Sequence, residues 1–135
     1  MFPQGLPGAN GRVTLYAMPG LSAMQAAIQT ISSRENRWLK RFRAALRGER
    51  DAEGLVGLEG PHLVEEALRS GLEVSALLFS ASGEMHWERL SSMVPPATQV
   101  LRTSDRLFAS VAGTEVPQGI AALARRPECS FDRLL

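Results

Sequence analysis

A short segment of the chain concentrates positive charge. Between Arg34 and Arg50, seven basic residues stand against two acidic ones, Glu35 and Glu49, so the segment carries a net charge of +5 and the rest of this +1 chain carries −4. Clustered Arg and Lys side chains attract a phosphate backbone, and binding releases the counterions of that backbone. The segment is therefore a candidate surface for nucleic acid, and the alternative interpretation is a solvated helix face. Its basic residues are Arg34, Arg37, Lys40, Arg41, Arg43, Arg47 and Arg50.

Two further motifs combine polar groups with glycine. In Glu59-Gly60, the carboxylate can accept a hydrogen bond from a ribose hydroxyl or a base amine. The alternative is structural, because Gly60 lets a strand turn into a helix whose dipole favours Glu59 at its N-terminus. The segment Thr114–Gly119 offers a hydroxyl, the Gln118 amide and backbone N–H groups, which suit single-stranded RNA. Its proline and glycine are equally typical of a turn into a strand.

No arrangement of side chains predicts catalysis or metal binding. His62 and His86 have no partner at catalytic or ligand spacing, so we expect a surface or capping role for both. Trp38 borders an apolar stripe and is expected to pack, whereas Trp87 lies in a polar stretch and is a candidate for stacking on a base. Cys129 has no second cysteine to pair with, which favours a reducing, cytoplasmic setting.

Apolar periodicity predicts the elements that carry these residues. The firmest helix covers Asn36–Arg47, because apolar residues recur at i, i+3 and i+7 from Leu39, and Ser32 or Ser33 is the expected N-cap. Further along we expect strands over 55–58, 74–80, 99–101 and 120–124, and helices over 61–70, 84–93 and 104–112. Strands that alternate with helices predict a layered α/β domain with a largely parallel sheet.

Length and composition allow one globular domain. The chain has 135 residues, of which 44% are hydrophobic and 21% charged, as in an ordinary soluble domain. We expect a flexible leader or extension over 1–30, with a short helix over 21–31, then the domain over 31–124 and a linker over 125–135. No run reaches the ~18 apolar residues of a membrane span. The first residues also lack the pattern of a signal peptide.

Four pieces of sequence, in a fixed order, resemble a known family. They are Ile31-Ser-Ser-Arg-Glu-Asn36 with the basic helix behind it, Leu58-Glu59-Gly60 leading into His62-Leu-Val-Glu-Glu-Ala67 and Ser70-Gly71, the strand Val74–Phe79, and Thr114-Glu-Val-Pro-Gln-Gly-Ile120. Together they resemble the N-terminal substrate-binding domain of SpoU/TrmH-type enzymes of the SPOUT superfamily, which methylate the ribose 2′-hydroxyl of ribosomal or transfer RNA. The last piece is the most specific.

The resemblance implies a three-layer α/β/α domain, similar to kink-turn-binding ribosomal proteins, whose role is to hold RNA. One departure concerns the edge before the Glu-Gly strand, where such domains often carry basic residues and this chain has Asp51 and Glu53. The residues expected at the RNA are Arg34, Asn36, Arg37, Lys40, Arg41, Arg43, Arg47, Glu59, Gly60, Thr114, Gln118 and Gly119.

In the family, a knotted catalytic domain follows, which binds S-adenosylmethionine and forms a dimer. Its asparagine-rich and glycine-rich motifs do not occur in this chain. For the chain alone we therefore expect a monomer with no cofactor, no metal and no methyl transfer. The full-length parent is expected to be a homodimeric RNA 2′-O-methyltransferase that uses S-adenosylmethionine.

Two other hypotheses stay open at this point. One is a standalone small RNA-binding protein of the kink-turn-binding ribosomal type, which the reading frame beyond Leu135 distinguishes from the first hypothesis. The other is a protein-interaction module, in which the basic helix binds an acidic partner. RNA titration at two salt concentrations separates this last hypothesis from the other two.

Overall fold

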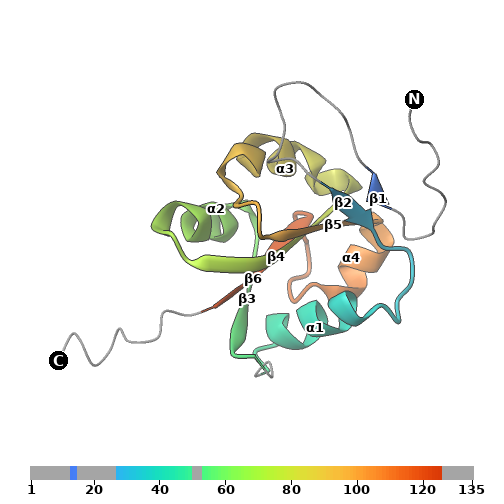
Figure 1. Ribbon diagram of the computed structural model, residues 1–135. Coiled ribbons are helices and arrows are strands. Elements are labelled where there is room, and N and C mark those ends of the chain that lie inside the picture. Colours follow the sequence, from blue (N-terminus) through green and yellow to red (C-terminus); the bar gives the residue numbers. More distant parts are fainter. Residues whose placement is uncertain (1–12, 15–26, 50–52, 126–135) are drawn as a thin grey trace.

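A six-stranded sheet forms the centre of the structure, a computed structural model that describes residues 13–14, 27–49 and 53–125 (Figure 1). The strands lie in the order β1-β2-β5-β4-β6-β3. They are β1 (Val13–Thr14), β2 (Ile28–Thr30), β3 (Leu55–Glu59), β4 (Glu73–Ser80), β5 (Gln99–Thr103) and β6 (Ile120–Arg125). The helices are α1 (Arg37–Leu46), α2 (Pro61–Ser70), α3 (Glu84–Leu90) and α4 (Asp105–Val111), with 3₁₀ turns η3 (Ala81–Gly83) and η4 (Ser91–Met93).

Four of the six described strands run in one direction. β2, β5 and β4 pair in parallel, whereas β6 lies antiparallel between β4 and β3, so β3 runs the same way as β4. The short β1 pairs antiparallel with β2 at the other end of the sheet. The predicted layered α/β domain with a mostly parallel sheet is confirmed, and the antiparallel β6 in its interior is a feature that the sequence pattern did not predict.

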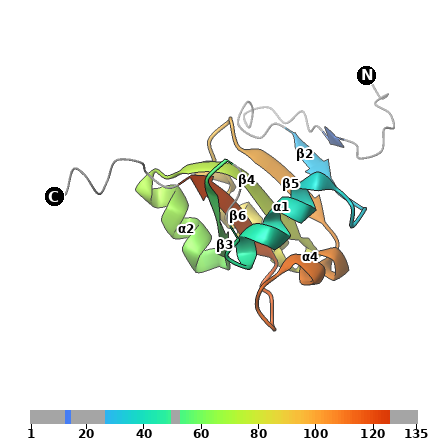
Figure 2. The same cartoon turned by 90° about the horizontal axis from the view of Figure 1, so that it is seen from below.

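Helices cover both faces of the sheet. α1 and α4 pack on one face, and α2 and α3 pack on the other (Figure 1 and Figure 2). In β4, Ala76 and Leu78 belong to the first core while Leu77 and Phe79 belong to the second, because successive side chains of a strand point to opposite faces. The expected three-layer α/β/α arrangement is therefore present.

The cap of α1 differs from the sequence prediction. Asn36 is the N-cap, and its side-chain oxygen accepts a hydrogen bond from the Trp38 N–H at 2.7 Å. The prediction of Ser32 or Ser33 is wrong, since the Ser33 hydroxyl instead accepts from the Glu35 N–H in the turn before the helix. An Asn cap satisfies one of the backbone donors that a helix start leaves unpaired.

One side of α1 is buried against the sheet. Leu39, Phe42 and Ala45 are buried, and Leu46 and Trp38 pack beside them while partly exposed. The predicted helix is one residue longer at each end than the observed one. Burial of this stripe fixes which side of the helix faces solvent, where Arg37 and Lys40 are exposed, whereas Arg41 and Arg43 at its margins are only partly exposed.

Two short strands lie inside residues 1–30, where the sequence predicts a leader and a helix. β1 and β2 pair with each other, and β2 joins the sheet beside β5. The helix expected over 21–31 is therefore wrong at 28–30, and its residues up to 26 lie outside the described residues. The Ile31 N–H continues the pairing, since it donates to the Arg102 carbonyl at 2.8 Å. An open strand edge that offers backbone partners outweighs a weak local helical pattern.

The start of the chain and its end are otherwise not described. Most of the predicted leader and nearly all of the predicted linker lie outside the described residues. At the linker, β6 includes Arg125, one residue beyond the domain boundary that the sequence predicts.

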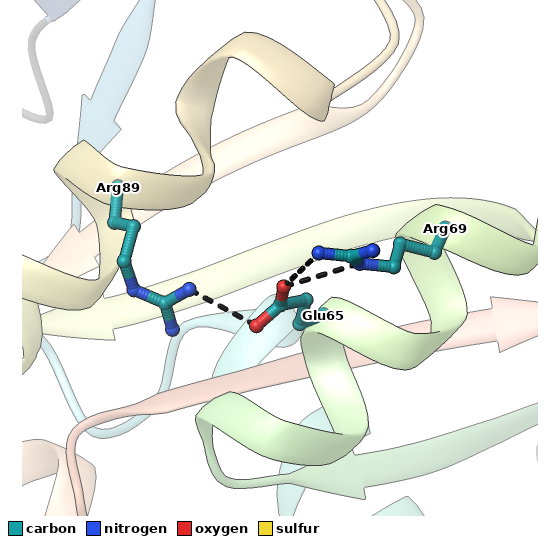
Figure 3. A network of polar contacts seen from close by, with 3 residues as sticks. All are labelled: Glu65, Arg69 and Arg89. Carbon is teal, nitrogen blue, oxygen red and sulfur yellow. Dashed lines mark hydrogen bonds and ion pairs between the residues drawn. The ribbon is translucent and has the colours of Figure 1, made fainter.

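Three charged residues join the two helices of the α2–α3 layer. Glu65 of α2 accepts hydrogen bonds from Arg69, one turn later, at 2.8 Å and from Arg89 of α3 at 3.0 Å (Figure 3). Donation first by Arg89 and then by Arg69 lowers the pKa of Glu65 below its ordinary value of 4.5. α3 is shorter than the helix predicted over 84–93, because it changes to a 3₁₀ turn after Leu90.

Candidate nucleic-acid interface

Many of the predicted site residues lie where the parallel strands end, at the side of the sheet that is here called its carboxyl edge. β2, β3, β4 and β5 end at this edge and β6 begins there, because β6 is antiparallel to its neighbours. The segments that follow these strands therefore lie side by side. Glu59 is the last residue of β3, Gly60 follows it, and Gly119 precedes β6. The carboxyl ends of strands in open α/β sheets are the usual position of ligand sites.

Glu59 fastens the segment 112–119, here called the α4–β6 loop, to this edge. Its Oε1 accepts a hydrogen bond from the Gly113 N–H at 2.9 Å, and its Oε2 accepts one from the Thr114 hydroxyl at 2.7 Å. The Gly60 N–H donates to the Ile120 carbonyl at 2.9 Å, which pairs the two chain segments beside these contacts. In the structure Glu59 therefore holds the loop in place. The sequence suggested an RNA contact or a favourable position at a helix N-terminus, and it did not suggest this role.

The other end of the α4–β6 loop is held by backbone packing. The Ser80 N–H donates to the Gly119 carbonyl at 2.9 Å. A Cβ on Gly83 would lie 2.0 Å from the same carbonyl oxygen, so only glycine fits at position 83. Gly119 itself has φ +77°, in the left-handed region that favours glycine. Sequence reasoning named Gly119 but missed Ser80 and Gly83, whose proximity no local pattern reveals.

Between these two anchors the loop presents its middle to solvent. Thr114, Glu115 and Gln118 are exposed, and Val116 is 80% exposed. The loop therefore combines a fixed backbone path with accessible polar side chains. A surface of this kind can make specific hydrogen bonds without first having to order itself.

The C-terminal end of α1 lies against the start of the loop. A Cβ on Gly113 would be 3.0 Å from the Leu46 carbonyl oxygen, so helix and loop are in contact at this point. Arg47, the C-cap residue of α1, is exposed next to that contact. The structure thus brings the basic helix and the polar loop to adjoining positions, although 65 or more residues separate them along the sequence.

The basic residues in and next to α1 include ion-paired and unpaired ones. Lys40 pairs with Glu35 at 3.4 Å, and Arg41 pairs with Glu53 at 3.3 Å. Among the described residues, Arg34, Arg37 and Arg47 are exposed and have no charged partner. The unpaired guanidinium groups are those that an incoming anion meets without breaking an ion pair.

Two arginines of α1 are partly withdrawn from solvent. The Arg41 guanidinium lies over the ring of Trp38, 5.0 Å from the ring centroid. The Nε–H of Arg43 donates to the Ser110 carbonyl of α4 at 3.5 Å. Glu53, which the sequence marked as a departure from the family, is thus an ion-pair partner of the basic helix, and Asp51 lies outside the described residues.

The tryptophans have structural positions. Trp87 stacks on Phe79 with a centroid distance of 5.4 Å and an interplanar angle of 5°, in the core beneath α2 and α3. Trp38 packs beside the core beneath α1 and α4, as predicted. Trp87, the candidate for stacking on a base, is therefore engaged by a protein ring instead.

Metal and membrane features are absent from the ranges that the structure describes. These ranges hold no group of three or more His, Cys, Asp or Glu side chains placed to bind a metal ion. None of their helices has the length and apolar character to cross a membrane. Cys129 lies outside them.

Residues 36–122 match the family model of the MRM3-like substrate binding domain. The chain belongs to this family. The match covers α1, the Glu59–Gly60 turn and the whole α4–β6 loop, which are the parts that form the edge described above. It supports the resemblance that the four sequence pieces indicate.

Full-length relatives place this domain within larger proteins. The chain is 32% identical over 102 residues to the 23S rRNA (guanosine(2553)-2′-O)-methyltransferase RlmP of Bacillus subtilis (strain 168), covering 75% of this chain and 39% of that protein. The crystal structure of an RNA 2′-O ribose methyltransferase matches with 26% identity and a TM-score of 0.63, over 76% of this chain and 40% of that one. The chain thus spans less than half the length of these relatives.

Two structures with lower sequence identity show the same fold. The rRNA methyltransferase of Sinorhizobium meliloti matches with 20% identity and a TM-score of 0.58, over 74% of this chain and 38% of that chain. The SpoU methyltransferase AviRb of Streptomyces viridochromogenes matches with 21% identity and a TM-score of 0.56, over 73% of this chain and 36% of that chain. Both support the α/β architecture.

Proposed function

We propose that this chain holds ribosomal RNA for a 2′-O-ribose methyltransferase, with α1 and the α4–β6 loop as the contact surface. The family match and the activity in the name of the Bacillus relative support the RNA methyltransferase context. The observation that carries the proposed surface is on α1. Arg37 and Arg47 are exposed and have no charged partner among the described residues; Arg37 is the first residue of α1, and Arg47 is its C-cap, at the end that adjoins the loop.

The helix and the loop have different tasks in this proposal. The guanidinium groups of α1 contact phosphates, which supplies affinity and orientation without reading the bases. Thr114, Gln118 and the backbone of the loop offer hydrogen bonds to riboses and base edges, which distinguish one RNA from another. Glu59 contributes by fixing the loop, and its two oxygens retain further lone pairs for a ribose hydroxyl.

The chemical step belongs, in this proposal, to the remainder of the full-length protein. The chain spans 39% of the Bacillus methyltransferase, so most of that protein has no counterpart in it. We assign S-adenosylmethionine binding, methyl transfer and dimerisation to that remainder. The chain by itself is then a cytoplasmic, monomeric RNA-binding unit without cofactor.

Titration with RNA at two salt concentrations tests the proposal. The probe is a labelled 23S rRNA fragment that spans the guanosine in the name of the Bacillus relative. Each phosphate contact contributes about 0.7–0.9 to the slope of log affinity against log salt. The double variant Arg37→Ala/Arg47→Ala should therefore flatten that slope by roughly 1.4–1.8 relative to the unaltered chain.

Arg69→Ala is the control. It removes one guanidinium from α2, on the opposite face of the sheet from α1, where Arg69 pairs with Glu65 at 2.8 Å. The control should keep the slope of the unaltered chain. Equal slopes in the double variant and the control would remove α1 from the RNA surface, and no RNA binding at all would favour an acidic protein partner.

A further inference from the structure

A pocket of about 380 Å³ lies beside the proposed RNA surface, between α4 and the segment that connects β2 to α1. β2 and β5 are neighbouring parallel strands, and the pocket is lined by residues that follow their ends, so it belongs to the same edge of the sheet. Its volume is at the lower end of the ~300–1,000 Å³ that small-molecule sites occupy. The lining residues are Ser32, Arg34, Ser104, Arg106, Leu107 and Ser110.

The lining is cationic and contains no carboxylate. It consists of two guanidinium groups, three hydroxyls and one apolar side chain. Arg34 and Arg106 have no charged partner among the described residues, so two like charges border one hollow. Such an arrangement is unfavourable in isolation and becomes favourable when an anion enters between the charges.

The acidic residues next to these arginines in the sequence are engaged elsewhere. Glu35 pairs with Lys40 at 3.4 Å. Asp105 accepts a hydrogen bond from the Ser82 N–H at 2.9 Å, so its carboxylate is directed to the segment after β4. Neither carboxylate neutralises the positive charge of Arg34 and Arg106, so an anionic ligand can do so.

The hydroxyls add directed hydrogen bonds. The Ser104 hydroxyl oxygen accepts from the Leu107 N–H at 3.1 Å, so its own hydrogen is available to an anion. The Ser110 hydroxyl donates to the Leu107 carbonyl at 2.7 Å, which fixes its position in the wall. Arginine and hydroxyl donors around one hollow are the groups that bind phosphate oxygens in proteins.

The pocket is continuous with the basic helix. The Ser110 carbonyl accepts the hydrogen bond from Arg43 of α1, and the Ser110 side chain lines the pocket. We infer that the pocket binds a phosphodiester group of the RNA, held between Arg34 and Arg106, and that the RNA backbone passes from α1 over α4. This inference rests on the proposed RNA binding and adds Arg106, a residue that no sequence motif singles out.

Single variants at the pocket test the inference in the same titration. Arg34→Ala and Arg106→Ala should each weaken binding of the 23S rRNA fragment about three- to tenfold at low salt. Each should also flatten the salt slope by about 0.7–0.9. Arg106→Lys should keep the slope, since it keeps the charge, and weaken binding less than alanine does. Because both arginines are exposed, the variants should keep the thermal unfolding midpoint of the unaltered chain, and this measurement is the control for intact folding.

Amide chemical shifts locate the effect. Addition of the RNA fragment should shift the Ser32, Leu107 and Ser110 amide signals of the unaltered chain, and these shifts should be smaller in Arg106→Ala at the same RNA concentration. If the unaltered chain binds RNA and Arg37→Ala/Arg47→Ala weakens it, while Arg34→Ala and Arg106→Ala match the Arg69→Ala control, the pocket inference is wrong and the proposed function stands. If the unaltered chain does not bind RNA, both are wrong.

Discussion

Replacement of Glu59 by alanine removes both hydrogen bonds that hold the start of the α4–β6 loop. The lost bonds are those from the Gly113 N–H at 2.9 Å and from the Thr114 hydroxyl at 2.7 Å. Hydrogen bonds to a charged acceptor contribute about 1.5–3 kcal/mol each, and exposure of the donors to water reduces this value because water replaces the lost partner. We therefore expect the free energy of unfolding to fall by about 1–2 kcal/mol.

Glu59→Gln is the informative comparison. The amide oxygen of Gln can accept from the Gly113 N–H, and its NH₂ can donate to the Thr114 hydroxyl, which is able to accept. Both contacts survive as neutral hydrogen bonds while the charge is lost, so the loss of stability should be about half of that in Glu59→Ala. Urea unfolding measures both variants, and hydrogen exchange at the Gly113 amide should accelerate only in Glu59→Ala.

Two outcomes would refute this reasoning. If Glu59→Ala unfolds at the same urea concentration as the unaltered chain, the two hydrogen bonds do not stabilise the loop. If Glu59→Gln is as destabilised as Glu59→Ala, the stabilisation comes from the negative charge near the start of α2 and not from the hydrogen bonds. That result would support the helix-dipole interpretation of the sequence.

Three further predictions concern packing, pH and cofactor. Gly83→Ala should destabilise the fold by about 1–3 kcal/mol in urea unfolding, because its Cβ would meet the Gly119 carbonyl oxygen at 2.0 Å. The lowered pKa of Glu65 means that its contacts with Arg89 and Arg69 add stability above about pH 4.5, and that this stability is lost as the pH falls through the folded-state pKa. The difference in thermal midpoint between the unaltered chain and Glu65→Gln should therefore shrink on acidification, and a constant difference from pH 7 to pH 3 would contradict the assignment. Calorimetric titration with S-adenosylmethionine should give no heat of binding, and micromolar affinity would overturn the assignment of the cofactor to the rest of the protein.

Local patterns predicted the elements well where burial is periodic. The stripe that starts at Leu39 located α1, and Pro61 and Gly71 marked the start and end of α2, where Pro61 is the first helical residue and Gly71 adopts a left-handed conformation. These signals act within one element, so a single sequence reveals them. The prediction failed for β2, because Ile28–Thr30 becomes a strand only through pairing with β5, which is about 70 residues away.

The sequence predicted which residue types form the candidate site, but not the contacts between residues that are distant in the sequence. Clustered charge identified the basic segment, and the turn glycines Gly60 and Gly119 indicated where the chain changes direction. The contact between Glu59 and Thr114 joins residues 55 positions apart, which no spacing rule captures. Arg106 stands alone on α4 and gains its significance only from Arg34 across the pocket.

The most direct test of the central claim, RNA binding through α1 and the α4–β6 loop, is an amide chemical-shift map of the chain with the 23S rRNA fragment. We expect the largest changes at the exposed positions of α1, near Arg37 and Arg47, and in the loop from Gly113 to Gln118. We expect little change around Arg69 and Arg89 of α2 and α3, which pack on the opposite face of the sheet (Figure 1). Large changes confined to α2 and α3, with α1 and the loop unaffected, would contradict it.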